Sequence, residues 1–151
     1  MPAFDTDKLL DDVGRHILRL LQENARLSLS EIGRQVGLSQ PAVAERVKRM
    51  EESGIITGYH AAVNPERMGR AVNVYIHVTA HNGHYERIEA FAKQQPEIIE
   101  CYCIAGKVDI LIKASFETLG DLSAMVDKLS TFGSVDSSII LGTYVSHRPL
   151  E

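Results

Sequence analysis

The stretch GLSQPAVAERVKRMEESG, residues 37–54, decides how the first third of the chain folds. Ser39 is a residue type that caps helix N-termini, and Pro41 stands in the first turn, where its missing N–H breaks no intrahelical bond. Glycines at both ends permit the left-handed conformation in which helices often stop. Apolar residues recur at helical spacing and form one stripe, namely Val43, Val47 and Met50. The stretch therefore predicts a helix with one buried face.

Two further helices are predicted before this one. The segment from Asp11 to Glu23 has an apolar stripe at helical spacing: Val13, Ile17, Leu20 and Leu21. Ser28 or Ser30 can cap the next segment, and Glu31, three residues after Ser28, completes a capping box. Ile32 and Val36 share one face of this short helix, which Gly37 ends. Two helices joined by a tight glycine-containing turn predict a helix-turn-helix. The β-branched run that follows, residues 55–63, predicts a small strand or wing.

The second half of the chain has the pattern of a mixed sheet. Asn-Pro and Gly in NPERMGR, residues 64–70, predict a hinge that separates a first domain, 1–63, from a second, 71–151. Period-two alternation then predicts strands, and helical spacing predicts two helices between them. In order, the predicted elements are a strand at 72–80, a helix at 85–95, strands at 98–105 and 109–116, a helix at 119–129 and a strand at 137–145. The predicted class is α+β: a winged helix-turn-helix domain followed by a ferredoxin-like βαββαβ domain.

The charge of the chain favours nucleic acid only locally. The formal net charge is -4, but between Arg26 and Arg49 five basic residues stand against two acidic ones, which is +3. Exposed charges more than about 8–10 Å away are largely screened at physiological salt, so the acidic second domain should not cancel this patch. Any binding to a polyanion therefore belongs to the predicted helix-turn-helix.

The second predicted helix of that motif offers groups suited to a DNA groove. Ser39 and Gln40 can reach base edges or phosphates, beside Pro41 at the helix start, and Ala42 can contact a thymine methyl. We assign Arg46 to the groove and three further basic residues mainly to phosphates: Arg34, Lys48 and Arg49. Glu45 can accept a hydrogen bond from a cytosine amine, although an intrahelical pair with Arg49 four residues on is the simpler role.

Other kinds of chemistry find little support in the sequence. No phosphate-binding glycine loop, nucleophile elbow or cysteine-hydrolase signature is present, so no catalytic residues are predicted. The spacing of His77, His81 and His84 does not converge on one face, and no metal site is predicted. Cys101 and Cys103 are expected to be small buried apolar thiols on one face of a strand. The acidic start of the chain has no signal-peptide pattern, and no apolar run is long enough to span a bilayer. We therefore expect a cytoplasmic, nucleoid-associated protein that does not bind a membrane.

The run DDVGRHILRLLQENARLSLSEIGRQVGLSQPAVAERVKRMEESGIITGYHAAVNPERMG, residues 11–69, resembles the DNA-binding half of the Lrp/AsnC (feast/famine) transcription regulators. The following βαββαβ pattern resembles their effector-binding and oligomerising domain, and together the likeness extends from about Lys8 to Val145. The resemblance implies a prokaryotic regulator of double-stranded DNA that dimerises through the second domain and often builds octamers from four dimers. It also implies that residues 39–49 form the recognition helix and that amino acids bind between dimers as effectors. We expect no other cofactor.

The resemblance also predicts an effector loop. The family pattern Gly-Asp-x-Asp falls on Gly106-Lys107-Val108-Asp109, so Lys107 replaces an acidic residue. Exchanging an acceptor for a cation should change which end of a ligand is recognised, or abolish binding, while Asp109 can receive a ligand amine. The candidate effector residues are Ile104, Ala105, Gly106, Lys107, Asp109, Ser137 and Ser138.

Three alternatives stay open at the level of sequence. The protein can be an effector-independent architectural regulator that wraps DNA, or its second domain can be a bare dimerisation module. From another class, some proteins of this two-domain plan resemble sirohaem decarboxylases. That function would need basic and histidine residues converging on a tetrapyrrole, and the second domain offers Lys107, His77 and His147.

Overall fold

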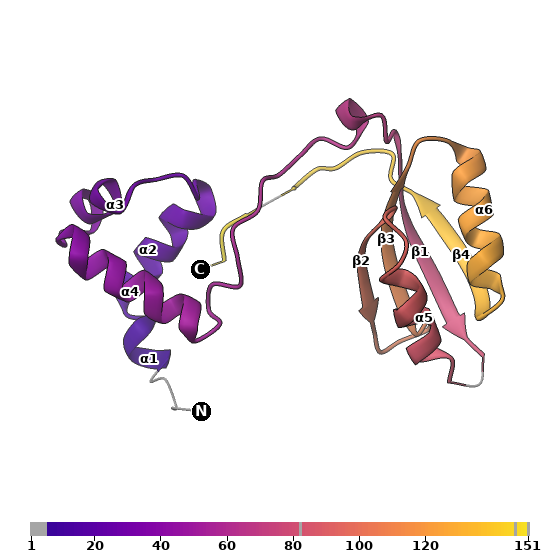
Figure 1. The fold of residues 1–151 in the computed structure, drawn as a ribbon, viewed down its shortest axis with the longest axis horizontal. Coiled ribbons are helices and arrows are strands. Elements are labelled where there is room, and N and C mark those ends of the chain that lie inside the picture. The colour runs from indigo at the N-terminus through magenta and orange to yellow at the C-terminus, as the bar shows by residue number, and fades with distance from the viewer. Residues whose placement is uncertain (1–5, 82, 147, 151) are drawn as a thin grey trace. The chain divides into compact units, whose positions relative to one another are not determined.

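The computed structural model describes residues 6–81, 83–146 and 148–150 and divides into two compact units (Figure 1). The first unit comprises Met1–Ala61 together with Val145–Glu151, and the second comprises Ala62–Tyr144. The predicted hinge, 64–70, thus groups with the second unit, where it contains a short 3-10 helix, η1, at Glu66–Met68. The described residues of the tail, 145, 146 and 148–150, group with the first unit, whereas the sequence suggested a second domain that continues to residue 151.

The first unit is a bundle of helices around a small apolar core. Its helices are α1 (Thr6–Leu9), α2 (Asp12–Glu23), α3 (Leu29–Val36) and α4 (Gln40–Glu52). The sequence did not predict α1, which has only four residues and no apolar period of its own. The core cluster contains the stripes expected for the other three helices, with Ile17, Leu20, Ile32, Val43 and Val47 buried. Met50, the third member of the α4 stripe, is also fully buried.

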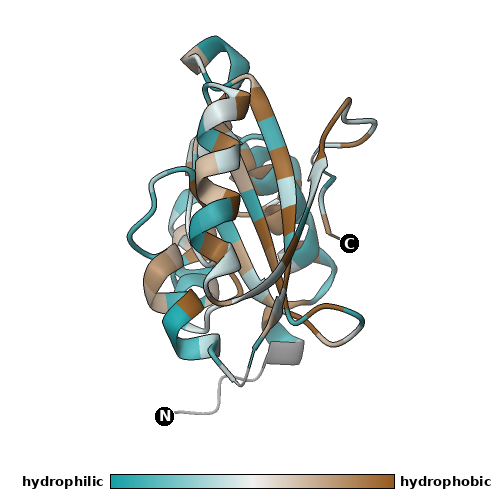
Figure 2. Cartoon of the chain, turned by 90° about the vertical axis from the view of Figure 1, so that its right-hand side faces the viewer, coloured by the Kyte–Doolittle hydropathy of each residue, from teal (hydrophilic) through white to brown (hydrophobic). Residues whose placement is uncertain are grey.

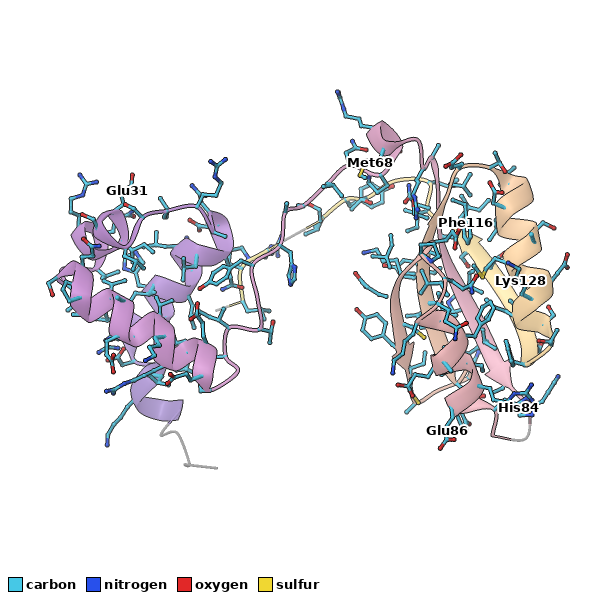
Figure 3. All side chains as sticks on the ribbon, in the orientation of Figure 1. Glu31, Met68, His84, Glu86, Phe116 and Lys128 are labelled. Carbon is cyan, nitrogen blue, oxygen red and sulfur yellow. The ribbon has the colours of Figure 1, made fainter. Side chains whose placement is uncertain are left out.

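The predicted helix ends are confirmed. The Ser28 hydroxyl accepts a hydrogen bond from the Glu31 N–H at 3.2 Å, and the Glu31 carboxylate accepts one from the Ser28 N–H at 2.8 Å, which closes the capping box. Figure 3 shows Glu31 at the start of α3. Gly37 is left-handed, with φ of 71°, and makes the tight turn into α4. Ser39 caps α4, whose first turn contains Pro41. The helix-turn-helix predicted from the sequence is therefore present.

The predicted strand or wing over residues 55–63 is wrong. These residues are all described, and they form bends and extended chain without a strand. A strand needs a partner for its backbone N–H and C=O groups, and the part of the first unit that the structure describes contains no other strand. The segment is instead fastened to α4, because the Ile56 N–H donates to the Met50 carbonyl at 3.0 Å.

The second unit is a four-stranded antiparallel sheet with two helices. Its elements are β1 (Val72–Ala80), α5 (Tyr85–Ala92), β2 (Ile98–Cys103), β3 (Ile110–Phe116), α6 (Leu119–Ser130) and β4 (Gly133–Ile139). The strand order is β2-β3-β1-β4, with β1 paired to both β3 and β4. This βαββαβ arrangement confirms the ferredoxin-like prediction.

Both helices pack on the same face of this sheet. Val74, Ile76 and Val78 of β1 are fully buried in one cluster with Ile88 of α5 and Leu129 of α6. Along the strands, hydrophobic residues alternate with hydrophilic ones, as Figure 2 shows. Among the elements of this unit that the structure describes, no helix covers the opposite face of the sheet (Figure 1).

Some predictions about this unit are wrong in detail. The helix expected over 85–95 ends at Ala92. The last strand was expected over 137–145, but β4 ends at Ile139 because β1, its partner, begins at Val72, and the Ile140 N–H makes the last backbone bond, to Asn73. Cys101 and Cys103 do share a face, being paired with Ile112 and Ile110, but both are exposed. They lie on the outermost strand and line a groove of about 740 Å³ between α5 and β2.

Candidate nucleic-acid interface and effector loop

The start of α4 presents short polar side chains on its surface. Ser39, Gln40 and Pro41 are exposed, and Ala42 is half-buried. The Ser39 hydroxyl accepts a hydrogen bond from the Ala42 N–H at 3.4 Å and so fixes the direction of the first turn. A helix N-terminus with small, exposed residues allows close approach of a polyanion to the backbone N–H groups. The expected groove residues therefore lie together.

Basic residues flank this start, and those on α4 have acidic partners. Arg34, in the last turn of α3, is exposed. The Arg49 Nε donates to the Glu45 carboxylate at 2.8 Å, which confirms the intrahelical pair expected from the sequence. The Lys48 Nζ lies 3.6 Å from Glu52. Exposed pairs of this i,i+4 type contribute only ~0.3–0.5 kcal/mol, so a phosphate can displace the acidic partner at little cost.

Arg46 differs from the other basic residues of α4. Its Nη1 and Nη2 atoms donate to the two carboxylate oxygens of Asp11 at 2.8 and 2.9 Å. The sequence assigned Arg46 to the groove, but its guanidinium is bound within the domain to a residue 35 positions away. The hydrogen bond from Arg46, followed by one from the Gly14 N–H, lowers the pKa of Asp11.

The end of α4 is tied to the segment that leaves the domain. The Tyr59 hydroxyl donates to the Glu51 carboxylate at 2.8 Å. Burial of the phenol, followed by this hydrogen bond, raises the pKa of Tyr59 to about 12. A tyrosine with a neighbouring carboxylate thus connects the helix to residues 55–60, a contact that the sequence gave no reason to expect.

In the second unit, Asp109 is already bonded within the protein. Its carboxylate accepts a hydrogen bond from the Ala80 N–H at 2.8 Å and another from the Tyr85 hydroxyl at 3.2 Å. The bond to Asp109 is the main reason why the pKa of Tyr85 is raised. Asp109 therefore fastens the loop before β3 to the end of β1 and the start of α5. A ligand amine at this carboxylate would have to share it with two donors.

The remaining effector candidates fall into two separate groups. Ala105, Gly106 and Lys107 are exposed in the loop between β2 and β3, and Ile104 is half-buried beside them. Ser137 and Ser138 lie on β4, opposite Ile76 and Tyr75 of β1. Because β1 stands between β3 and β4, neighbouring strands being about 4.8 Å apart, one chain does not bring the two groups together.

Among the residues considered for a tetrapyrrole or a metal, those that the structure describes do not form a cluster. His77 lies within β1, where its Nδ1 is 4.0 Å from Asp136, whereas Lys107 is in the loop between β2 and β3. His147 lies outside the described residues. Among the residues that the structure describes, no group of three or more His, Cys, Asp or Glu side chains has a geometry for a metal ion. None of the helices in the described ranges is long and apolar enough to cross a bilayer.

Each of the two units matches a known protein domain. A model of the AsnC-type helix-turn-helix domain matches residues 10–51, and a model of the Lrp/AsnC ligand binding domain matches residues 73–150. The chain belongs to the Lrp/AsnC family of transcriptional regulators. This Lrp/AsnC protein is therefore a DNA-binding transcription regulator with a ligand-binding domain, and the relatives that it matches are transcriptional regulators rather than enzymes.

Relatives match nearly the full length of this Lrp/AsnC chain. It is 33% identical over 131 residues to the HTH-type transcriptional regulator LrpC of Bacillus subtilis, covering 87% of this chain and 91% of the relative. It is 38% identical over 131 residues to a proline dehydrogenase transcriptional activator of Rhodobacter capsulatus, covering 84% and 85%.

Solved structures of other transcriptional regulators have the same fold as this chain. The structure of B. subtilis LrpC has a TM-score of 0.86 at 31% identity and covers 91% of this chain and 99% of its own. A Neisseria meningitidis transcriptional regulator, solved as a complex with L-Met, has a TM-score of 0.88 at 29% identity and covers 94% and 96%.

Proposed function

We propose that α4 is the recognition helix of this regulator and that it reads a DNA sequence in the major groove. In this assignment Ser39, Gln40, Pro41 and Ala42 face the base edges, and Arg34, Lys48 and Arg49 contact phosphates. Glu45 stays at the edge of the interface and gives up Arg49 to a phosphate when DNA binds. The observation that supports the proposal is the exposed, capped and small start of α4 next to basic residues held only by weak pairs.

This division of labour is tested by measuring affinity for two duplexes. One is the duplex that the wild-type chain enriches from a randomised library, and the other is a shuffled duplex of equal composition. Gln40→Ala should reduce the preference for the enriched duplex roughly tenfold. Lys48→Ala should weaken both duplexes by a similar factor and flatten the salt dependence by about one unit of slope.

A matched control is Lys128→Ala, which removes an equal charge from the last turn of α6 in the other unit (Lys128 is labelled in Figure 3). This substitution should leave both affinities unchanged. If Gln40→Ala and Lys48→Ala change the two duplexes in the same way, the assignment of base and phosphate contacts is wrong.

We further propose that a small molecule, most simply an amino acid, regulates this protein by shifting its assembly. The candidate site is the loop 104–109, completed by Ser137 and Ser138 of another copy, since one chain keeps the two groups apart. The proposed assembly is a dimer formed through the second unit, with octamers as tetramers of dimers, in the cytoplasm and on the nucleoid. The uncovered face of the sheet, with half-buried Tyr75, His77 and Leu111, supports such a contact. Residues 64–70 would then be the hinge between the DNA-binding and assembled parts.

The effector is tested by a thermal-shift screen of the purified protein against the common amino acids. A ligand at about a hundred times its Kd should raise the melting temperature by roughly 5–10 °C. Size-exclusion chromatography with and without each ligand that gives a shift should show a change in assembly. Lys107→Asp restores an acidic residue in the loop and should change which ligands give a shift.

Two observations favour a second function. Lys107 takes the place of an acidic residue, and the Asp109 carboxylate is already bonded to the Ala80 N–H and the Tyr85 hydroxyl. Both features weaken a site for an amino-acid amine, so an effector-independent, architectural regulator that wraps DNA is the alternative. A flat thermal response to every amino acid, together with an unchanged large assembly, would support it.

A further inference from the structure

One carboxylate in the first unit connects the start of α2 with the middle of α4. Asp11 is the N-cap of α2, and its Oδ1 accepts a hydrogen bond from the Gly14 N–H at 2.7 Å. The same carboxylate accepts two hydrogen bonds from Arg46, one at each oxygen, at 2.8 and 2.9 Å. The pair is thus bidentate, which is the geometry in which an arginine–carboxylate bond has both strength and a fixed direction.

The corner that holds Asp11 is closely packed. Leu9, the last residue of α1, is 7% exposed. A Cβ added to Gly14 would lie only 1.8 Å from the Leu9 carbonyl oxygen, so only glycine allows this approach of backbone to backbone. The end of α1 also lies beside α4, where Leu9, Ala42 and Arg46 line one small groove. Asp11 therefore lies in a closely packed part of the first unit.

Arg46 lies at the margin between the buried and the exposed faces of α4. It precedes the buried Val47 and follows the buried Val43 by three residues, so its Cα is near the apolar stripe. Its side chain is 30% exposed, compared with 67% for Lys48 and 57% for Arg49. To reach DNA, the Arg46 side chain would have to break both of its parallel hydrogen bonds to Asp11, the N-cap residue of α2. Within the described ranges, Lys48 and Arg49 have no such bidentate bond to break.

We propose that Arg46 is a positioning residue, which sets the angle of the recognition helix by its bidentate bond to Asp11 and does not read a base. This proposal rests on the proposed role of α4 in the major groove. Apolar contacts have no fixed direction, so the core alone leaves the angle of α4 free to change by a small amount. The bidentate bond from Arg46 to Asp11 has a fixed direction, and it therefore sets the angle at which Ser39 and Gln40 enter the groove. Asp11, which touches no DNA, then contributes to sequence preference.

The two roles of Arg46 predict opposite results for Asp11→Asn. Asparagine caps helices as well as aspartate does, so the start of α2 is kept while the bidentate ion pair is lost. If Arg46 positions the helix, this substitution should reduce the preference for the enriched duplex over the shuffled one about fivefold. If Arg46 reads a base, the substitution frees its guanidinium and removes a negative charge, and the preference should stay the same or increase.

The experiment is a double-mutant cycle on the full chain with these two duplexes. Asp11→Asn, Arg46→Gln and the double variant should each lose about the same preference, because the second substitution removes a bond that the first has already broken. A matched control, Arg49→Gln, should weaken both duplexes equally. An unchanged preference in Asp11→Asn, or losses that multiply in the double variant, would overturn the proposal.

Two further measurements keep the outcome clear. Far-UV circular dichroism and the melting temperature show that each variant is folded at the assay temperature. If Asp11→Asn unfolds, Arg46→Lys takes its place: it keeps the charge but cannot form two parallel bonds, and an unchanged preference would again contradict the proposal. A wild-type chain that prefers neither duplex would contradict the proposed recognition by α4 itself, which is a different failure.

Discussion

Removing one acidic side chain from α4 should strengthen DNA binding. In the free protein the Glu45 carboxylate holds the Arg49 Nε at 2.8 Å, with side chains 56% and 57% exposed. Exchange of this pair for a phosphate contact costs ~0.3–0.5 kcal/mol, the usual contribution of an exposed i,i+4 pair. A carboxylate ~7 Å from a phosphate adds a repulsion of about 0.6 kcal/mol in water. Glu45→Gln removes both, and the sum of about 1 kcal/mol corresponds to roughly fivefold tighter binding.

The assay is fluorescence anisotropy with the enriched and the shuffled duplex over a range of salt concentrations. Since the gain is electrostatic, it should be similar for both duplexes and should decrease as salt increases. The matched control is Glu89→Gln, which breaks a pair of the same order, Glu89 to Lys93, on α5 of the other unit. Equal gains from both substitutions, or weaker binding by Glu45→Gln, would refute the placement of this face of α4 against the phosphates.

Further predictions concern the stability of the first unit. Gly33→Ala should lower the melting temperature more than Gly37→Ala. A Cβ on Gly33 would lie 2.5 Å from the Leu38 carbonyl oxygen, whereas a Cβ on Gly37 would meet no atom within 4 Å. Gly37→Ala therefore costs only the ~1 kcal/mol of placing a non-glycine residue in the left-handed conformation. Ile32→Ala should reduce the free energy of unfolding in urea by about 2–5 kcal/mol, since Ile32 is fully buried in the core. The pKa of Tyr59, about 12, is raised above its unfolded value of 10.0. Its neutral form therefore stabilises the fold below pH ~10, and this contribution is lost as the pH rises to about 12. Tyr59→Phe should remove tyrosinate absorbance that appears near pH 12.

Features set by neighbouring residues could be predicted from the sequence. The capping box of Ser28 and Glu31, the left-handed Gly37 and the buried stripe of α4 each depend on spacing within a few residues. The same is true of the βαββαβ order, because period-two and helical patterns alternate clearly after residue 71. For the Glu45–Arg49 pair, the i,i+4 rule alone was sufficient.

Features that depend on distant partners could not be predicted in this way. Asp11 is recognisable as a helix cap, but nothing local shows that its second partner is Arg46. The exposure of Cys101 follows from the place of β2 at the edge of the sheet, which the alternation of residues does not specify. In the same way, the apolar run after Ile139 forms no strand, since β1 is too short to pair with it. The partners of Asp109 lie on β1 and α5, and only the fold brings them to the loop.

The central claim is that α4 of a symmetric dimer reads DNA. The most direct measurement is selection of bound duplexes from a randomised library by the full chain, followed by sequencing. Two recognition helices in successive major grooves predict an enriched motif of two inverted half-sites with centres about 10–10.5 bp apart. Gln40→Ala should relax the motif at defined positions within each half-site. Enrichment without inverted symmetry, or a motif that Gln40→Ala leaves unchanged, would contradict the account.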